Sequence, residues 1–206
     1  MPREAGPLLG QVCLAYQIQA RPHSTSLSAL SRFQDQLETG FAEAMFRIPV
    51  ASLHLTILPL IDVVEDPPLP RPAGDLWRTH EKAWIHAIDL ACATVLGFPL
   101  RPIELRYTSH AVILLAHSPN PIEDLRQQLA ENCGLPHRRV RVPTITHVTL
   151  FRYLRPGLGV ERHRTDALPD GIFVNEVRLV RENVYPSLDV TVIRNWQLSG
   201  NYPGSR

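Results

Sequence analysis

The sequence predicts an α+β fold of two similar lobes, each a small sheet backed by helices. Apolar residues alternate with polar ones in some segments and recur every three to four residues in others, which indicates strands and helices in one chain. The order strand, helix, strand occurs twice, in residues 11–61 and 111–154, and each copy ends in the pattern His-apolar-Thr-apolar-apolar. This repetition favours two lobes whose histidine-bearing strands face one another.

The first half of the chain predicts a strand, a helix and a second strand. Apolar side chains alternate with smaller or polar ones at Val12, Leu14, Tyr16 and Ile18, as in a strand with one core face. After the cap-like sequence HSTS, helical spacing is kept by Leu27, Leu30, Phe33 and Leu37, and Gly40 suits a helix stop. The strand over residues 51–61 then carries the first His-x-Thr.

The second half repeats this order after a proline-rich connector, residues 66–72. A long helix is expected over residues 75–96, followed by strands at 103–107 and 110–117. Asn120-Pro121 opens a helix that ends before Gly134, and the strand with the second His-x-Thr comes next.

The C-terminal part predicts a loop followed by two strands. Residues 155–171 are rich in Arg, Gly and Pro and predict the loop. Residues 172–180 and 188–198 predict a pair of antiparallel strands.

Composition limits the class of protein. The chain has 206 residues, 44% of them hydrophobic and 20% charged, and a formal net charge of +1. We expect one globular domain over residues 1–206. The N-terminus lacks a signal-peptide pattern and no apolar run approaches the ~18 residues of a membrane span, so we expect a cytoplasmic protein with no membrane contact, and a monomer.

Several chemistries are disfavoured by the residues that the sequence lacks. Cys13, Cys92 and Cys133 stand singly without Cys-x-x-Cys spacing, which indicates neither a disulfide framework nor a structural zinc site. No glycine-rich phosphate loop, Gly-x-Ser-x-Gly motif or carboxylate cluster occurs, which weakens kinase, α/β-hydrolase and two-metal nuclease interpretations. The small net charge argues against a protein that coats nucleic acid, but it allows a local cationic cleft.

The two copies of the repeated pattern are HLTIL, residues 54–58, and HVTLF, residues 147–151. Side chains two residues apart in a strand share a face, so each strand should present its His and Thr together. Two imidazoles can divide a reaction between a general acid and a general base. A threonine hydroxyl can donate to a phosphate oxygen as charge develops there. The quartet of His54, Thr56, His147 and Thr149 therefore suits displacement at a phosphodiester without metal.

These motifs resemble those of the 2H phosphoesterase superfamily, which is named for paired His-x-Thr/Ser motifs and includes 2'-5' RNA ligase-like proteins and cyclic nucleotide phosphodiesterases. The resemblance covers about residues 11–198. It implies a bilobal, pseudo-two-fold arrangement of two small antiparallel sheets backed by helices, with a central cleft. It also implies hydrolysis of a 2',3'-cyclic phosphate or 2'-5' phosphodiester in RNA or a small nucleotide, with no cofactor and no metal. By resemblance, His54 protonates the leaving group and His147 activates water.

Residues after the second motif are candidates for substrate binding. The motif continues as His-x-Thr-Leu-x-Arg, a form common among RNA ligase-like members, which implies a phosphate or nucleotide contact for Arg152. In a regular strand Arg152 points away from His147, so it reaches the cleft only at a bulge or at the strand end. The same alternation places Phe151 and Tyr153 on the cleft face, where an aromatic ring can stack on a base. The first motif has Pro59 where RNA ligase-like members have an aromatic residue.

Two other functions stay open at this point. One is a protein that keeps such a cleft and binds nucleotide or RNA without turnover, and the other is metal-dependent hydrolysis by scattered histidines. His80 and His86 are poor metal partners, because six residues correspond to a rotation of about 240° on a helix. The basic segment 137–143, just before the second motif, suits either a solvated loop or a surface that a phosphate-rich ligand approaches.

Overall fold

The structure is a computed structural model that describes residues 9–38, 45–63, 71–134, 141–154, 162–165 and 167–200. Its elements follow in the order β1 (Val12–Pro22), α1 (Ser24–Glu38), β2 (Met45–Arg47), a 3-10 turn (Val50–Ser52), β3 (Leu55–Ile61), α2 (Ala73–Ala93), β4 (Phe98–Leu100), β5 (Pro102–Tyr107), β6 (Ala111–Ala116), α3 (Asn120–Asn132), β7 (Thr146–Tyr153), β8 (Arg162–Arg164), β9 (Ile172–Val184) and β10 (Asp189–Gln197). The expected mixture of helices and strands is confirmed.

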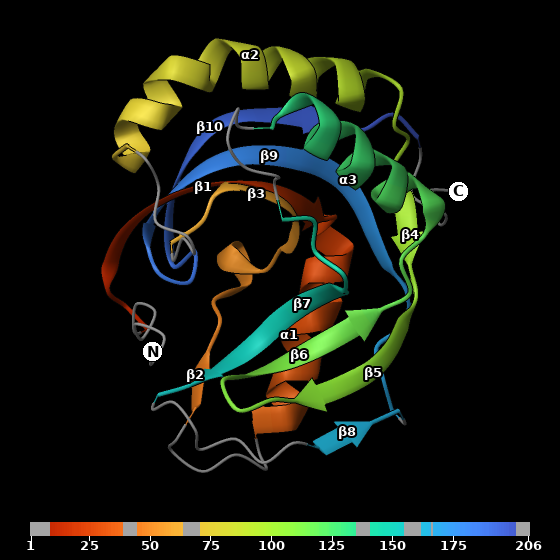
Figure 1. Ribbon diagram of the computed structural model, residues 1–206. Coiled ribbons are helices and arrows are strands. Elements are labelled where there is room, and N and C mark those ends of the chain that lie inside the picture. The colour runs from red at the N-terminus through yellow and green to blue at the C-terminus, as the bar shows by residue number, and fades with distance from the viewer. Residues whose placement is uncertain are drawn as a thin grey trace.

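The described strands form two antiparallel sheets (Figure 1). The first sheet has the order β10-β9-β1-β3, with β4 paired to β9, and the second has the order β2-β7-β6-β5-β8. Each strand with a His-x-Thr pairs with the strand that comes one helix earlier, β3 with β1 and β7 with β6. The repeat in the sequence is therefore a repeat in structure, and the α+β class with two antiparallel sheets is confirmed.

The helices of the two repeats exchange sheets. The helix α3 follows β6 in the chain, yet it contacts β3 and lies beside α2 over the first sheet (Figure 1). The helix α1 follows β1, yet it packs on the second sheet, where the Gln34 side-chain amide donates to the carbonyl of Leu150 at 2.8 Å. Each histidine strand is thus backed by a helix from the other half of the chain.

One continuous core joins both sheets and anchors the backs of the histidine strands. The side chains that alternate with the motif residues, Leu55, Ile57, Val148 and Leu150, are 1% exposed or less and belong to this core. Burial of one such side chain stabilises the fold by about 1.5–3 kcal/mol. The apolar positions of the repeated pattern therefore fix each strand in place.

Several predicted elements have different ends in the structure. The first histidine strand begins at Leu55 and not at residue 51, because residues 50–52 form a 3-10 turn. The long helix ends at Ala93 and not near Leu96, since the chain beyond it turns to pair with residues near Ser199. On β1, Tyr16 and Ile18 are buried as expected, whereas Val12 is 86% exposed.

Some of the sequence predictions fall on other parts of the chain. The helix stop at Gly40, most of the connector 66–72 and part of the loop 155–171 lie outside the described residues. The described part of that expected loop contains the short strand β8, which pairs with β5. Among the residues that the structure describes, no helix has both the length and the apolar character needed to cross a membrane.

Candidate active site

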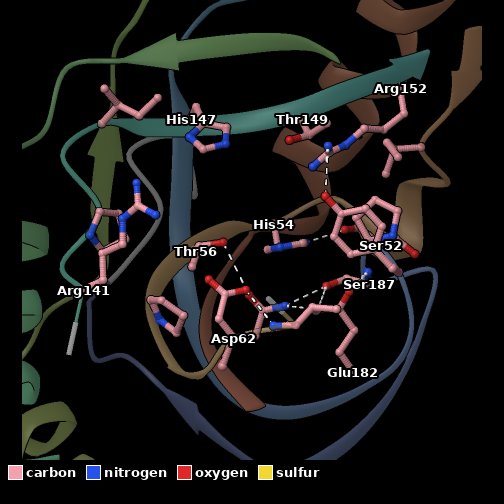
Figure 2. Close-up of a pocket in the computed structure, with 18 of the residues that line it drawn as sticks. Ser52, His54, Thr56, Asp62, Arg141, His147, Thr149, Arg152, Glu182 and Ser187 are labelled. Carbon is pink, nitrogen blue, oxygen red and sulfur yellow. Dashed lines mark hydrogen bonds between the residues drawn. The ribbon is translucent and has the colours of Figure 1, made fainter. Parts of the chain in front are cut away.

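A pocket of about 420 Å³ lies between the two sheets, where β3 and β7 come together. Its lining includes His54 and Thr56 from the first sheet and His147 and Thr149 from the second. Figure 2 shows the first pair across the pocket from the second. The structure therefore brings together the four side chains that the repeated pattern singled out.

A bulge in β3 shapes one side of the pocket. In the pairing with β1, Gln19 faces Thr56 and Ile18 faces Leu58, so Ile57 has no partner. Ile57 and Leu58 are both buried, and the alternation of the strand shifts by one residue. As a result Pro59, the residue of the first motif that departs from the RNA ligase-like pattern, lines the pocket together with His54 and Thr56.

A second bulge occupies the same place in β7. Ile113 faces Thr149 and Val112 faces Phe151, so Leu150 has no partner in β6. Beyond this bulge Arg152 lines the pocket. Pro59 and Arg152 each stand five residues after their histidine, and both reach the pocket by the same local irregularity.

The bulge overturns the simple alternation expected for β7. Phe151 is 1% exposed within the core, and neither Phe151 nor Tyr153 is among the described residues that line the pocket. The expectation that these two rings lie on the cleft face is therefore wrong. Arg152 takes that position because the unpaired residue before it rotates the rest of the strand.

His54 lies immediately before β3 and is oriented by its own backbone. Its Nδ1 is 2.7 Å from the carbonyl oxygen of Ser52, so Nδ1 carries a proton and Nε2 is the nitrogen left for proton exchange. Burial lowers the pKa of His54 to about 4; the contact with Ser52 opposes this shift, and the charges of Arg178, His147 and Arg152 add to it. Without a ligand the ring is neutral at neutral pH.

His147 also lies close to positive charges. Burial lowers its pKa to about 4, and the positive charges of Arg152 and then Arg126 add to the shift. Both rings are therefore neutral in the free protein. An anion bound between them favours the imidazolium form, so ligand binding and protonation of this pocket are coupled.

Thr56 belongs to a polar network on the first sheet. Its hydroxyl lies 3.5 Å from Gln17 Oε1, and the Gln17 amide donates to Glu182 Oε2 and to Ser187 Oγ, each at 2.8 Å. Ser187 N–H also donates to Glu182 at 2.7 Å. Burial raises the pKa of the Glu182 carboxyl, and the Ser187 backbone contact partly offsets this. The Thr56 hydroxyl donates to Gln17 over this long contact, and it must turn its proton from Gln17 to donate to a bound phosphate.

Two arginines lie on opposite sides of the motif residues (Figure 2). Arg152 donates to the Tyr185 hydroxyl at 3.3 Å, and its buried Nε has no hydrogen-bond partner among the described residues. An unpaired N–H of a guanidinium suits an anionic ligand. Arg141, from the basic segment before the second motif, also lines the pocket, whereas Arg138 and Arg139 lie outside the described residues.

Sequence reasoning did not find Gln17, Glu182, Tyr185 and Ser187 as lining residues. Three of them belong to β9 or its turn, which is far in the sequence from both motifs. Gln17 is a polar residue of the alternating strand that pairs with the first motif strand. Among the described residues there is no group of three or more His, Cys, Asp or Glu side chains that could hold a metal ion.

The two-sheet fold is shared with solved structures that are 18–19% identical to this chain, one of which is described as a phosphoesterase. The chain is similar to the crystal structure of TT0787 from Thermus thermophilus, with a TM-score of 0.66, 19% sequence identity, and coverage of 91% of this chain and 100% of that chain. It is also similar to E. coli LigT complexed with NADP+, with a TM-score of 0.61, 18% identity and coverage of 91% and 99%. No protein-family model and no curated protein matches the chain by sequence.

Proposed function

We propose that the protein is a metal-independent phosphoesterase that hydrolyses a 2',3'-cyclic phosphate or a 2'-5' phosphodiester in RNA or a small nucleotide. One observation carries this proposal: two histidines and two threonines, contributed in pairs by two sheets, line one pocket. A phosphate held between the pairs would meet a hydroxyl donor and an imidazole on each side. An in-line displacement needs proton transfer at opposite sides of phosphorus, and the position of the two imidazoles on different sides of the pocket supports such a role.

The surroundings of the two rings support the division of roles that the resemblance implies. The Ser52 carbonyl accepts a hydrogen bond from His54 and favours its protonated form, which suits the proton donor to the leaving oxygen. Burial and positive charges lower the pKa of both rings, so the hydrogen bond to Ser52 is the feature that distinguishes His54, and His147 is then the base that activates water. Thr56 and Thr149 are then the donors to the non-bridging phosphate oxygens.

Crystal structures with the same fold support a nucleotide substrate. E. coli LigT has been crystallised with 3'-AMP and with phosphate, and these two structures are 18% and 17% identical to this chain. A nucleoside phosphate carries the anion that the cationic pocket of this chain favours, and Arg152 is the side chain that we propose for its phosphate.

A screen of phosphodiesters tests the proposal. Candidates are 2',3'-cyclic mononucleotides, 3',5'-cyclic mononucleotides and 2'-5' linked dinucleotides, and the position of the remaining phosphate monoester identifies the bond that was cut. We expect turnover of at least one 2',3'-cyclic or 2'-5' substrate, and loss of that turnover in the His54→Ala, His147→Ala double variant. Equal turnover by this double variant would reject the proposal.

The second candidate is a binding protein that retains the cleft without turnover. The observation in its favour is that both imidazoles are neutral in the free protein, so that no acid is charged before a ligand arrives. Binding of a cyclic nucleotide with no product after prolonged incubation would support it.

A further inference from the structure

Arg126 is a buried charge that enters the proposed chemistry only through its effect on the pKa of His147. It lies on α3 and is 1% exposed, and Glu123, its ion-pair partner at 3.3 Å, has a side chain that is 49% exposed. Burial of an arginine without a buried counter-ion is costly, because the charge leaves water and little attraction compensates for it. The hydrogen bonds of Arg126 must therefore compensate for the cost of its burial.

All five N–H groups of Arg126 have an acceptor within 3.3 Å. Two are in β3: Nη2 donates to the carbonyl of Thr56 at 2.9 Å and Nε to that of Ile57 at 3.3 Å. Two belong to the start of β7: Nη2 donates to the carbonyl of Ile145 at 3.2 Å and Nη1 to Thr146 Oγ1 at 2.9 Å. The fifth donates to Glu123.

These contacts join the two strands directly behind the motif residues. Thr56 is itself a motif residue, and Thr146 precedes His147 in the chain. The two strands belong to different sheets, so no sheet hydrogen bond sets their spacing. Arg126 connects both strands through a single rigid, planar group.

The structure contains a matched neutral side chain at the equivalent helix position. The buried faces of α1 and α3 have identical spacing: Leu30, Phe33, Gln34 and Leu37 against Ile122, Leu125, Arg126 and Leu129. Gln34 donates to the carbonyl of Leu150, the unpaired bulge residue three positions after His147. In the same way, Arg126 donates to the carbonyl of Ile57, the unpaired bulge residue three positions after His54. The other contact of Gln34 is with Ile48, next to β2. Gln34 therefore supports one bulge without carrying a charge.

We propose that Arg126 is a positioning residue that sets the spacing between the two histidine strands, and thereby the geometry of acid and base across the pocket. This inference rests on the proposed function of that pocket. Displacement of reacting groups by about 1 Å can cost on the order of 100-fold in rate, so the loss of Arg126 acts on kcat more than on KM.

The charge of Arg126 gives the proposal a second readout. The charged groups that act on His147 are Arg152 on its own strand and Arg126 from α3, and His147 itself acts on His54 across the pocket. The positive charges lower the pKa of His147. Removal of Arg126 therefore raises this pKa, whereas removal of the neutral Gln34 leaves it unchanged.

The experiment compares Arg126→Met, Arg126→Lys and Gln34→Met. For the substrate found in the screen, kcat should fall about 10- to 100-fold in Arg126→Met with KM changed less than about threefold. Arg126→Lys should also lower kcat, because a lysine has three donors for the five acceptors, but it should keep the pKa of His147. NMR titration of the His147 ring in the ligand-free protein should show a raised pKa in Arg126→Met only.

Two results would overturn the proposal. One is wild-type kcat in Arg126→Lys, and the other is the same His147 pKa in Arg126→Met and Gln34→Met. If Arg126→Met does not fold, the kcat of Arg126→Lys decides whether Arg126 positions the two strands. If the wild-type protein turns over no substrate, the proposed function fails by itself, and the titration of His147 still decides whether Arg126 acts on this ring.

Discussion

Arg152 and Tyr185 meet across the pocket, one from each sheet. The Arg152 Nη1 donates to the Tyr185 hydroxyl at 3.3 Å, and the guanidinium carbon lies 5.4 Å from the centre of the tyrosine ring. Arg152 comes from β7 and Tyr185 from the turn after β9. This contact holds the arginine over the motif residues while its Nε stays unpaired among the described residues.

Arg152→Met is therefore expected to weaken phosphate binding. A hydrogen bond to a charged group contributes about 1.5–3 kcal/mol, which corresponds to roughly a 10- to 100-fold rise in KM or in the dissociation constant of 3'-AMP. Tyr185→Phe removes only the neutral hydroxyl and should change either constant less than about tenfold. Calorimetry with 3'-AMP measures both variants, and unchanged affinity in Arg152→Met would show that the phosphate lies elsewhere.

Replacement of either motif histidine should remove most activity. Loss of a general acid or base lowers kcat by about 100- to 10,000-fold, and the double variant should be little worse than the single ones because the two act as a unit. His86→Ala is the matched control, since this exposed histidine on α2 is remote from both motifs in the sequence. Unfolding curves establish that each variant is folded, and near-normal kcat in a folded His147→Ala would contradict the assigned chemistry.

The pH profile should differ between the free enzyme and the complex. The pKa of each motif histidine is about 4 in the free protein, and the reaction needs one ring protonated, so kcat/KM should fall as pH rises above this value. A bound phosphate raises the pKa of the acid, so the alkaline limb of kcat should lie at higher pH. A cyclic phosphodiester keeps its charge across this range, and a kcat/KM that stays flat as pH rises from the pKa of the free rings to neutrality would contradict the prediction.

Chelation tests the expectation that no metal is required. Incubation with EDTA followed by removal of the chelator should leave kcat unchanged, because the four motif side chains supply acid, base and oxyanion donors without a Lewis acid. Elemental analysis of the purified protein is the companion measurement. Loss of activity that zinc or manganese restores would favour the metal-dependent alternative.

The apolar positions of the motif should govern stability. Leu55 is fully buried behind His54 and Thr56, so Leu55→Ala should lower the free energy of unfolding by about 2–5 kcal/mol. Leu90 on α2 is 62% exposed, and Leu90→Ala should change the free energy of unfolding by less than about 0.5 kcal/mol. Urea denaturation measures both, and equal effects would place Leu55 outside the core.

The sequence by itself determined the class of fold and four of the residues that line the pocket. Local periodicity reports helices and strands, and the repeated His-x-Thr placed both residues of each pair on one face. The sequence contains a further indication that was not used. Gln34 and Arg126 are polar residues on the otherwise mainly apolar buried faces of two helices, and the buried residues around them have the same spacing.

Only the tertiary structure decided the rest of the site. Strand alternation cannot locate a bulge, so it placed Phe151 and Tyr153 on the cleft face and let Arg152 reach the cleft only at a bulge or at the strand end. The pairing with β6 contains such a bulge. The exchange of α1 and α3 between sheets is equally hidden, because each helix keeps the same apolar face whichever sheet it covers. Gln17, Glu182, Tyr185 and Arg126 meet the motifs through contacts between distant segments, and local patterns carry no information on such contacts.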